Sequence, residues 1–158
     1  MIRRAEQGDA DGIASIWNPV IRDTTITFNP DEKTVAVVAA IIASPDPVLV
    51  WEEGGRILGF ARYFPFRAGA GYRHTSEHTI LLAPEGRGRG GGRALMAALC
   101  SDAAAAGRHS LWAGVTADND AGVAFHASVG FRTIARLPEV GWKFGRWIDL
   151  ILMMKPLA

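Results

Sequence analysis

The stretch that decides the fold is Thr79-Ile80-Leu81-Leu82-Ala83-Pro84-Glu85-Gly86-Arg87-Gly88-Arg89-Gly90-Gly91-Gly92-Arg93, which leads into the apolar run 94–100. Its first four residues predict a strand, its glycine-rich middle a turn, and the following run a helix. Glycines let the backbone approach an anion closely, and the unpaired amides of a helix start point at it. The order predicts a phosphate-binding loop, to which Arg87, Arg89 and Arg93 add positive charge.

Three known motifs compete for this loop, besides an ordinary glycine-rich turn with solvated arginines. A P-loop ends in Gly-Lys-Ser/Thr, whereas these glycines lead into Arg93. A dinucleotide fingerprint needs an early βαβ unit and an acidic residue about 20 residues on, and the glycine spacing fits it poorly. The third motif, Arg/Gln-x-x-Gly-x-Gly/Ala, is matched by Arg87, Gly90 and Gly92 and is similar to the pyrophosphate loop of coenzyme A acetyltransferases.

Length and composition indicate a single globular domain over residues 1–158. Hydrophobic residues make up 49% and charged residues 21% of the chain, and the net charge of +1 argues against bulk attraction to nucleic acid or membrane. The single cysteine, Cys100, allows no intrachain disulfide, fits a reducing compartment and lies on an apolar helix face as core filler. With no 18-residue apolar span and no signal peptide, we expect a cytoplasmic protein.

The remaining pattern predicts a mixed α/β domain in the order β-α-α-β-β-β-α-β-α-β-β. Strands are expected at 2–5, 48–52, 57–64, 76–82, 110–116, 131–137 and 147–154. Helices are expected after a cap at Asp9 or Asp11, from near Asp31 to the Ser44-Pro45 stop, from 93 to 106 and from 119 to 129. We expect a longer polar and aromatic loop at 138–146.

This order, with the glycine loop between the fourth strand and the third helix, resembles the GCN5-related N-acetyltransferase (GNAT) family. A second motif from Asn119 to Phe131 is similar to the family's Asn-x(6)-Tyr-x(3)-Gly-Phe segment, with His126 in place of the usual tyrosine. The resemblance implies a mostly antiparallel central sheet flanked by helices, and acetyl-CoA as cosubstrate. The residues it assigns to acetyl-CoA are Ile80, Leu81, Leu82, Arg87, Gly88, Arg89, Gly90, Gly91, Gly92, Arg93 and Asn119.

Over nearly the whole chain, the sequence is similar to the phosphinothricin and methionine sulfone acetyltransferase branch of that family. The stretches that carry this resemblance are Thr24-Thr25 with Phe28, residues 71–79 and residues 140–150. It implies acetylation of the α-amino group of small amino-acid analogues such as phosphinothricin, methionine sulfoximine and methionine sulfone. It also implies a homodimer. A histidine at position 126 occurs in this branch as well, which leaves the identity of the general acid open.

Amide formation from a thioester needs a neutral amine, so a base must take the ammonium proton. Glu77 is the candidate, directly or through a water; the alternative is a surface pair with Arg73 or His78. A backbone amide from Ile80 to Leu82 is a plausible donor to the oxyanion, because the family's strands splay apart there. His126 is placed to protonate the leaving thiolate, and the alternative is an ordinary hydrogen-bonded histidine on a short helix.

A free amino acid carries a carboxylate that a bidentate arginine suits, and Arg73 is the nearest candidate to Glu77. Arg73 can equally be interpreted as a solvated loop residue. Expected substrate-binding residues are Phe28, Tyr72, Arg73, Thr75 and Glu77. His74 and His78 beside Glu77 suggest a metal, but strand alternation sends His78 to the face opposite Glu77, so we expect none.

A patch of Trp142, Lys143, Phe144, Arg146 and Trp147 is aromatic and basic. Because the net charge of the chain is close to zero, this patch is only a weak indication of a nucleic-acid surface. A dimer interface, or a rim over the partner's active site, fits the patch better. Two alternatives to a small-molecule acetyltransferase stay open. One is a protein or peptide N-acetyltransferase; the other is a non-catalytic acetyl-CoA sensor, which would need neither Glu77 nor His126. The physiological substrate is not determined by the sequence.

Overall fold

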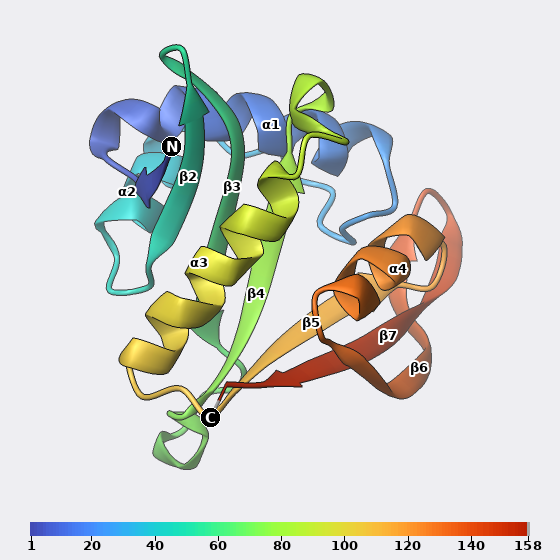
Figure 1. Cartoon of the computed structure of the whole chain (residues 1–158). Helices are drawn as coiled ribbons and strands as arrows, with labels where there is room; N and C mark the ends of the chain where they lie inside the picture. Colours follow the sequence, from blue (N-terminus) through green and yellow to red (C-terminus); the bar gives the residue numbers. More distant parts are fainter. Residues whose placement is uncertain (158) are drawn as a thin grey trace.

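The computed structural model describes residues 1–157 and contains a seven-stranded sheet with helices on both faces (Figure 1). The strands lie in the order β1-β2-β3-β4-β5-β7-β6, and only the neighbours β4 and β5 among them are parallel. The strands are β1 (Ile2–Arg4), β2 (Val48–Glu53), β3 (Arg56–Pro65), β4 (Thr75–Leu82), β5 (Ser110–Thr116), β6 (Arg132–Lys143) and β7 (Arg146–Pro156). The α-helices are α1 (Ala10–Asp23), α2 (Val35–Ala43), α3 (Gly91–Ala105) and α4 (Asp120–Ser128), with 3₁₀ turns η1 (Gln7–Asp9), η2 (Ala70–Tyr72) and η3 (Pro84–Gly86). This order confirms the predicted fold class.

Two apolar cores lie on the two faces of the sheet. Helices α1 and α2 cover one face, and α3 and α4 the other (Figure 1). The apolar stripe of α1 is buried as predicted, and its Trp17 packs on Phe60 of β3 with ring centroids 4.9 Å apart. Asp9 precedes α1, but its carboxylate binds Arg3 at 2.7 Å instead of capping the helix.

The prediction that the second helix begins near Asp31 is wrong, because α2 begins at Val35. The Thr34 hydroxyl accepts a hydrogen bond from the Val37 amide at 3.1 Å and caps the helix there. Before it, the Asn18 side chain binds both the amide and the carbonyl of Lys33, each at 2.8 Å. These two bonds hold the preceding segment extended on α1 and delay the helix.

The predicted loop at 138–146 is also wrong, since β6 and β7 form one long hairpin. A two-residue turn at Phe144 and Gly145 joins them, with φ of 51° and 73°, the left-handed values that tight hairpins use. Residues 138–140 of the expected loop form a bulge instead, between Leu137 and Gly141. Asp149 of β7 fixes the bulge by accepting the Glu139 amide at 2.8 Å.

Candidate active site

Strands β4 and β5 diverge in the middle of the sheet. Their parallel pairing covers the first three residues of β4 and ends at Glu77, opposite Trp112; the described chain shows none beyond it. β4 nevertheless continues to Leu82 beside β3. The main-chain groups of Ile80–Leu82 that face β5 therefore have no strand partner and are free to bind a ligand.

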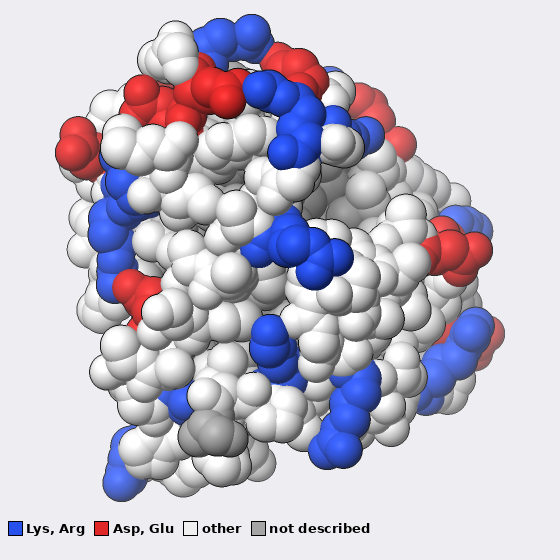
Figure 2. All heavy atoms as spheres, in the orientation of Figure 1, with Lys and Arg blue, Asp and Glu red and all other residues white. Residues whose placement is uncertain are grey.

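A cavity of about 860 Å³ opens where the two strands diverge. Figure 2 shows a hollow beside the start of α3, bordered by lysine or arginine side chains. The cavity is bounded by β4, β5, α4, the β4–α3 loop and part of the segment 26–33. It brings together the predicted residues Phe28, Glu77, Ile80, Leu81, Leu82, Arg87, Gly88, Gly92, Asn119 and His126.

The glycine loop keeps the start of α3 open to an anion. Gly90 is the N-cap of α3 with φ of 80°, and Gly88 has φ of 71°, backbone conformations that favour glycine. Gly91 packs so closely on the Trp51 ring that a β-carbon there would overlap it. Because Gly90 has no side chain to cap the helix, the first amides of α3 stay available, and this cradle fits a pyrophosphate.

The three arginines of the loop do not converge on one point. Arg87 lines the cavity, whereas Arg89 forms an ion pair with Glu53 at the end of β2. Arg93 donates to the Ser128 carbonyl at 3.0 Å and so ties α3 to the end of α4. Only Arg87 of the three is therefore placed beside the cradle.

The residues predicted around Arg73 lie outside the cavity of the single chain. Tyr72 and Arg73 are exposed at the end of η2, and Thr75 begins β4 at the far end from the glycine loop. The Arg73 carbonyl accepts a hydrogen bond from Arg108, while Tyr72 packs near Phe66 with centroids 6.4 Å apart. In one chain, these residues are not brought to Glu77.

Glu77 lies at the point where β4 leaves β5. It is half-buried on the cavity wall, and burial raises the pKa of its carboxyl, while the charge of Arg67 opposes this rise. Its Oε1 lies 3.7 Å from the position that a β-carbon on Gly114 of β5 would take, which is an ordinary contact distance and places the carboxylate beside β5. No ion pair between Glu77 and Arg73 or His78 occurs among the described residues.

The neighbouring His78 points to the other face, as strand alternation predicts. It is 7% exposed and packs against His126 of α4, itself 8% exposed, with their Nε2 atoms 3.0 Å apart. At the start of α4, Asn119 caps the helix by accepting the Gly122 amide at 2.9 Å. A β-carbon on Gly122 would overlap the Asn119 side chain, so this glycine fixes the asparagine at the cavity. From the sequence, His78 was considered only as a metal ligand or a surface partner of Glu77, and Gly122 was given no role of its own.

Residues 26–29 also line the cavity, and a buried lysine holds the segment 24–29 that contains them. Lys143 of β6 is 3% exposed, and its Nζ donates to the carbonyls of Ile21, Thr24 and Thr27 at 2.6, 2.7 and 2.8 Å. Phe28, at the end of this segment, lines the cavity. Placing Lys143 in an exposed patch was wrong, because strand alternation turns it inward.

Lys33 is a cation of the cavity that sequence analysis missed. Its Nζ lies over the Trp17 ring, 4.6 Å from the centroid, and it lines the same cavity as Glu77. Burial lowers the pKa of Lys33, and the charge of Arg62 lowers it further. No carboxylate within the described part of the chain forms an ion pair with Lys33. Together with Arg87, it supplies the positive charge of the cavity wall.

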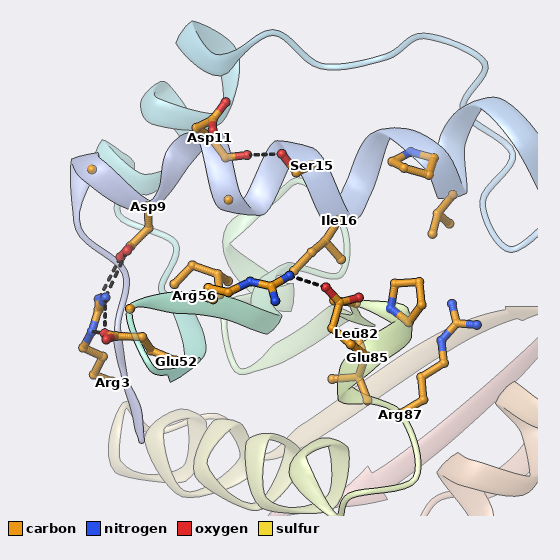
Figure 3. A pocket seen from close by; sticks show the side chains of 18 residues that line it. Arg3, Asp9, Asp11, Ser15, Ile16, Glu52, Arg56, Leu82, Glu85 and Arg87 are labelled. Carbon is orange, nitrogen blue, oxygen red and sulfur yellow. Dashed lines mark hydrogen bonds and ion pairs between the residues drawn. The ribbon is translucent and has the colours of Figure 1, made fainter.

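A second pocket of about 570 Å³ lies between α1 and the β2–β3 hairpin (Figure 3). Its charged side chains largely neutralise one another: Arg3 binds Asp9 and Glu52, and Arg56 binds Glu85. Of its other charged residues, Asp11 and Arg87 form no ion pair among the described residues, and Arg87 also lines the cavity at Glu77. Residues 1–157 contain no group of three or more His, Cys, Asp or Glu side chains that could hold a metal ion. No helix in that range is long and apolar enough to span a membrane.

Comparison with known proteins agrees with this geometry. The family model described as acetyltransferase (GNAT) family matches residues 16–131. An L-amino acid N-acyltransferase of Escherichia coli is 37% identical over 99% of this chain and 93% of its own length. A methionine sulfoximine/methionine sulfone acetyltransferase of Salmonella typhimurium is 36% identical over 99% of this chain and 94% of its own. A phosphinothricin acetyltransferase of Sinorhizobium meliloti, solved with acetyl-CoA, is 29% identical with a TM-score of 0.92, covering 100% of this chain and 88% of its own.

The resemblance that the sequence motifs predicted is thereby confirmed over nearly the full length. The matched family, the acetyltransferase fold and the open edge of β4 beside a glycine cradle all agree. The chain belongs to the acetyltransferase (GNAT) family and is an N-acetyltransferase.

Proposed function

We propose that this enzyme transfers an acetyl group from acetyl-CoA to the α-amino group of a small amino acid or analogue, of the phosphinothricin, methionine sulfoximine or methionine sulfone type. The observation that carries the proposal is the half-buried Glu77 at the divergence of β4 and β5, in one cavity with the start of the glycine cradle. The substrates in the names of its relatives support the choice of amine.

The acetyl-CoA assignment rests on the fit of the cavity to that molecule. The open amides at the start of α3 and Arg87 would hold the pyrophosphate, and Asn119 with the free edge of β4 would hold the arm. When bound, acetyl-CoA supplies the acetyl group activated as a thioester.

The residues of the chain would then carry out the proton transfers and stabilise the developing charge. Glu77, with its pKa raised by burial, takes a proton from the substrate ammonium, directly or through a water. A main-chain amide of Ile80–Leu82 donates to the carbonyl oxygen as negative charge develops on it. His126 supplies a proton to the departing sulfur.

We further propose that Lys33 orients the carboxylate of the substrate. It is a cation on the wall of the cavity that holds Glu77, whereas Arg73 lies outside that cavity in one chain. Arg73 and Tyr72 stay predicted contacts, which a second subunit would have to bring to the site.

A homodimer is part of this proposal. Large apolar side chains on the β6–β7 hairpin are exposed, and β6 is the edge of the sheet. They are Ile134, Val140, Trp142, Phe144 and Trp147. Trp142 and Trp147 pack edge to face with ring centroids 4.9 Å apart and would lie at the centre of such an interface.

A thiol-release assay with acetyl-CoA tests the function against free amino acids, their sulfones and sulfoximines, phosphinothricin, short peptides and amine-bearing antibiotics. Turnover confined to the amino-acid class is expected. Preference for peptides would instead favour a peptide acetyltransferase, and acetyl-CoA binding without turnover on any amine would favour a sensor.

A further inference from the structure

Two buried histidines form a continuous hydrogen-bonded chain across the cavity wall, from β5 to α4. The Trp112 carbonyl lies 2.9 Å from His78 Nδ1, the two Nε2 atoms lie 3.0 Å apart, and the Gly122 carbonyl lies 2.7 Å from His126 Nδ1. Both rings line the cavity that holds Glu77. The proposed chemistry uses His126 but leaves His78 without a role.

The positions of the protons follow from the two ends of this chain. A carbonyl oxygen only accepts, so each Nδ1 must carry a proton and donate it outward. The Nε2 atoms then face each other, and without a further proton their lone pairs would repel at hydrogen-bond distance. We infer that His78 and His126 share a single proton between their Nε2 atoms, so that the pair carries one positive charge and His78 positions the acid proton of His126.

The surroundings of the two rings determine which imidazole carries the shared proton. Burial, and next the charge of His126, lower the pKa of His78 to about 3, so His78 stays neutral and its Nε2 accepts. The extra proton therefore belongs to His126. Burial also lowers the pKa of His126, while the hydrogen bond from its Nδ1 to the Gly122 carbonyl raises it. A proton on His126 Nε2 can be donated to His78 Nε2, and this contact favours the protonated His126 ring. A second extra proton on the pair is excluded by the same burial.

No other ionisable group is hydrogen-bonded to the pair within residues 1–157. Phe125 and Phe131 cover His126 with centroid distances of 5.3 and 5.2 Å. The cations on the neighbouring elements α3 and β7, Arg93 and Lys155, bind the carbonyls of Ser128 and Val129. Glu77 is on the opposite face of β4, and Cys100 of α3 is buried with its thiol pKa raised.

This inference rests on the proposed function where it concerns catalysis. When the sulfur departs from the acetyl group, the shared proton turns from His78 to the sulfur: its hydrogen bond to His78 Nε2 and its bond to His126 Nε2 break and an S–H bond forms, so the positive charge of the pair and the negative charge on sulfur cancel. Two neutral rings with facing lone pairs remain, and uptake of one proton from solvent restores the pair. His78 would thus act through His126 and not on the substrate.

Nitrogen-15 NMR of the imidazoles in the protein without coenzyme tests the shared proton directly. At neutral pH we expect both Nδ1 atoms of the pair to be protonated and the two Nε2 signals together to account for one proton. His74 and His109, the other two of the 4 histidines, are exposed and serve as internal references. A bare Nδ1 on either ring, or two bare Nε2 atoms, would overturn the inference, whether or not the enzyme acetylates amino acids.

Kinetics separate a positioning role from a structural one. His78→Phe is expected to keep acetyl-CoA affinity, lower kcat about tenfold or more, and move the alkaline limb of the kcat profile to lower pH, because His126 then loses its proton more easily. His78→Gln, whose amide oxygen can accept the Nε2 proton, should recover part of both. Ser76→Ala is the matched control, a buried polar residue of the same strand and face, 2% exposed.

An unshifted alkaline limb in both His78 variants would show that the residue only fills space. If His78→Phe does not fold, the Gln variant and the NMR measurement decide. If the unmodified enzyme acetylates no amine, the proposed function fails while the NMR result still tests the shared proton.

Discussion

The ring of Phe28 lies directly on Gly141, so closely that a β-carbon at position 141 would overlap it. Gly141 ends the bulge in β6, and Phe28 lines the cavity that contains Glu77. The bulged strand therefore sets the depth at which this ring enters the pocket, and only glycine permits that depth.

Gly141→Ala should displace the Phe28 ring and raise KM for the amine several-fold. Little change is expected in the dissociation constant of acetyl-CoA, because the site that we propose for it lies at the start of α3. Steady-state kinetics and calorimetry measure the two. Gly8→Ala is the control, since a β-carbon there meets nothing within 4 Å and no left-handed backbone is involved. Equal effects of both variants would contradict the assigned role of the contact.

Glu77→Gln should keep acetyl-CoA binding and lower kcat about 10²–10⁴-fold, the usual cost of losing a general base. Stopped-flow or steady-state thiol release at neutral pH measures the loss. Turnover near the unmodified level would remove Glu77 from the mechanism.

The pH profile offers an independent check on Glu77. Burial raises the pKa of its carboxyl above the ordinary value, so the acid limb of kcat/KM should lie above pH 4.5. The Arg67 charge lowers that pKa, and so Arg67→Met should move the acid limb to still higher pH. A movement toward lower pH would show that the limb reports another group.

Gly90→Val should raise the dissociation constant of acetyl-CoA strongly, because valine resists the left-handed conformation that opens the start of α3. Gly107→Val is a closely matched control. Gly107 has φ of 78° against 80° for Gly90, neither β-carbon would meet an atom within 4 Å, but Gly107 lies beyond the other end of the same helix. Comparable losses of affinity in two folded variants would mean that backbone strain alone, and not the cradle, is measured.

Lys33→Met and Arg73→Ala decide between two cations for the substrate carboxylate. If Lys33 binds it, Lys33→Met should lower kcat/KM about tenfold or more on methionine sulfone and much less on its carboxamide, as expected for a charge-assisted bond worth about 1.5–3 kcal/mol. Arg73→Ala should then affect both compounds alike. The reverse pattern would assign the carboxylate to Arg73 and indicate that a second subunit completes the site.

Local patterns of the chain predicted the part of the site built from consecutive residues. The run from Thr79 to the helix after Arg93 predicted the glycine cradle, and strand alternation predicted that Glu77 and His78 lie on opposite faces of β4. The start of α2 and the extension of the last two strands through residues 138–146 were missed, because they depend on the Asn18 bonds to Lys33 and on a bulge held by Asp149.

The outer members of the site depended on contacts between distant residues. Arg89 forms an ion pair with Glu53, and Arg93 donates a hydrogen bond to Ser128. No spacing in the sequence predicts either partner. Lys143 reads as a surface residue until β6 is known to continue through it, after which alternation alone places it inside. Arg73 is near Glu77 in the chain, but the length of β4 separates it from the cradle.

Adjacent residues of β6 give this edge strand two distinct attachments. Trp142 faces outward, 54% exposed, on the surface where we propose a second copy to dock, and Lys143 faces inward and grips the carbonyls of the loop that carries Phe28. The proposed dimer surface and the wall of the proposed substrate pocket are thus joined through one peptide bond. A tilt of β6 imposed from outside would reach the pocket without any side chain of the partner entering it.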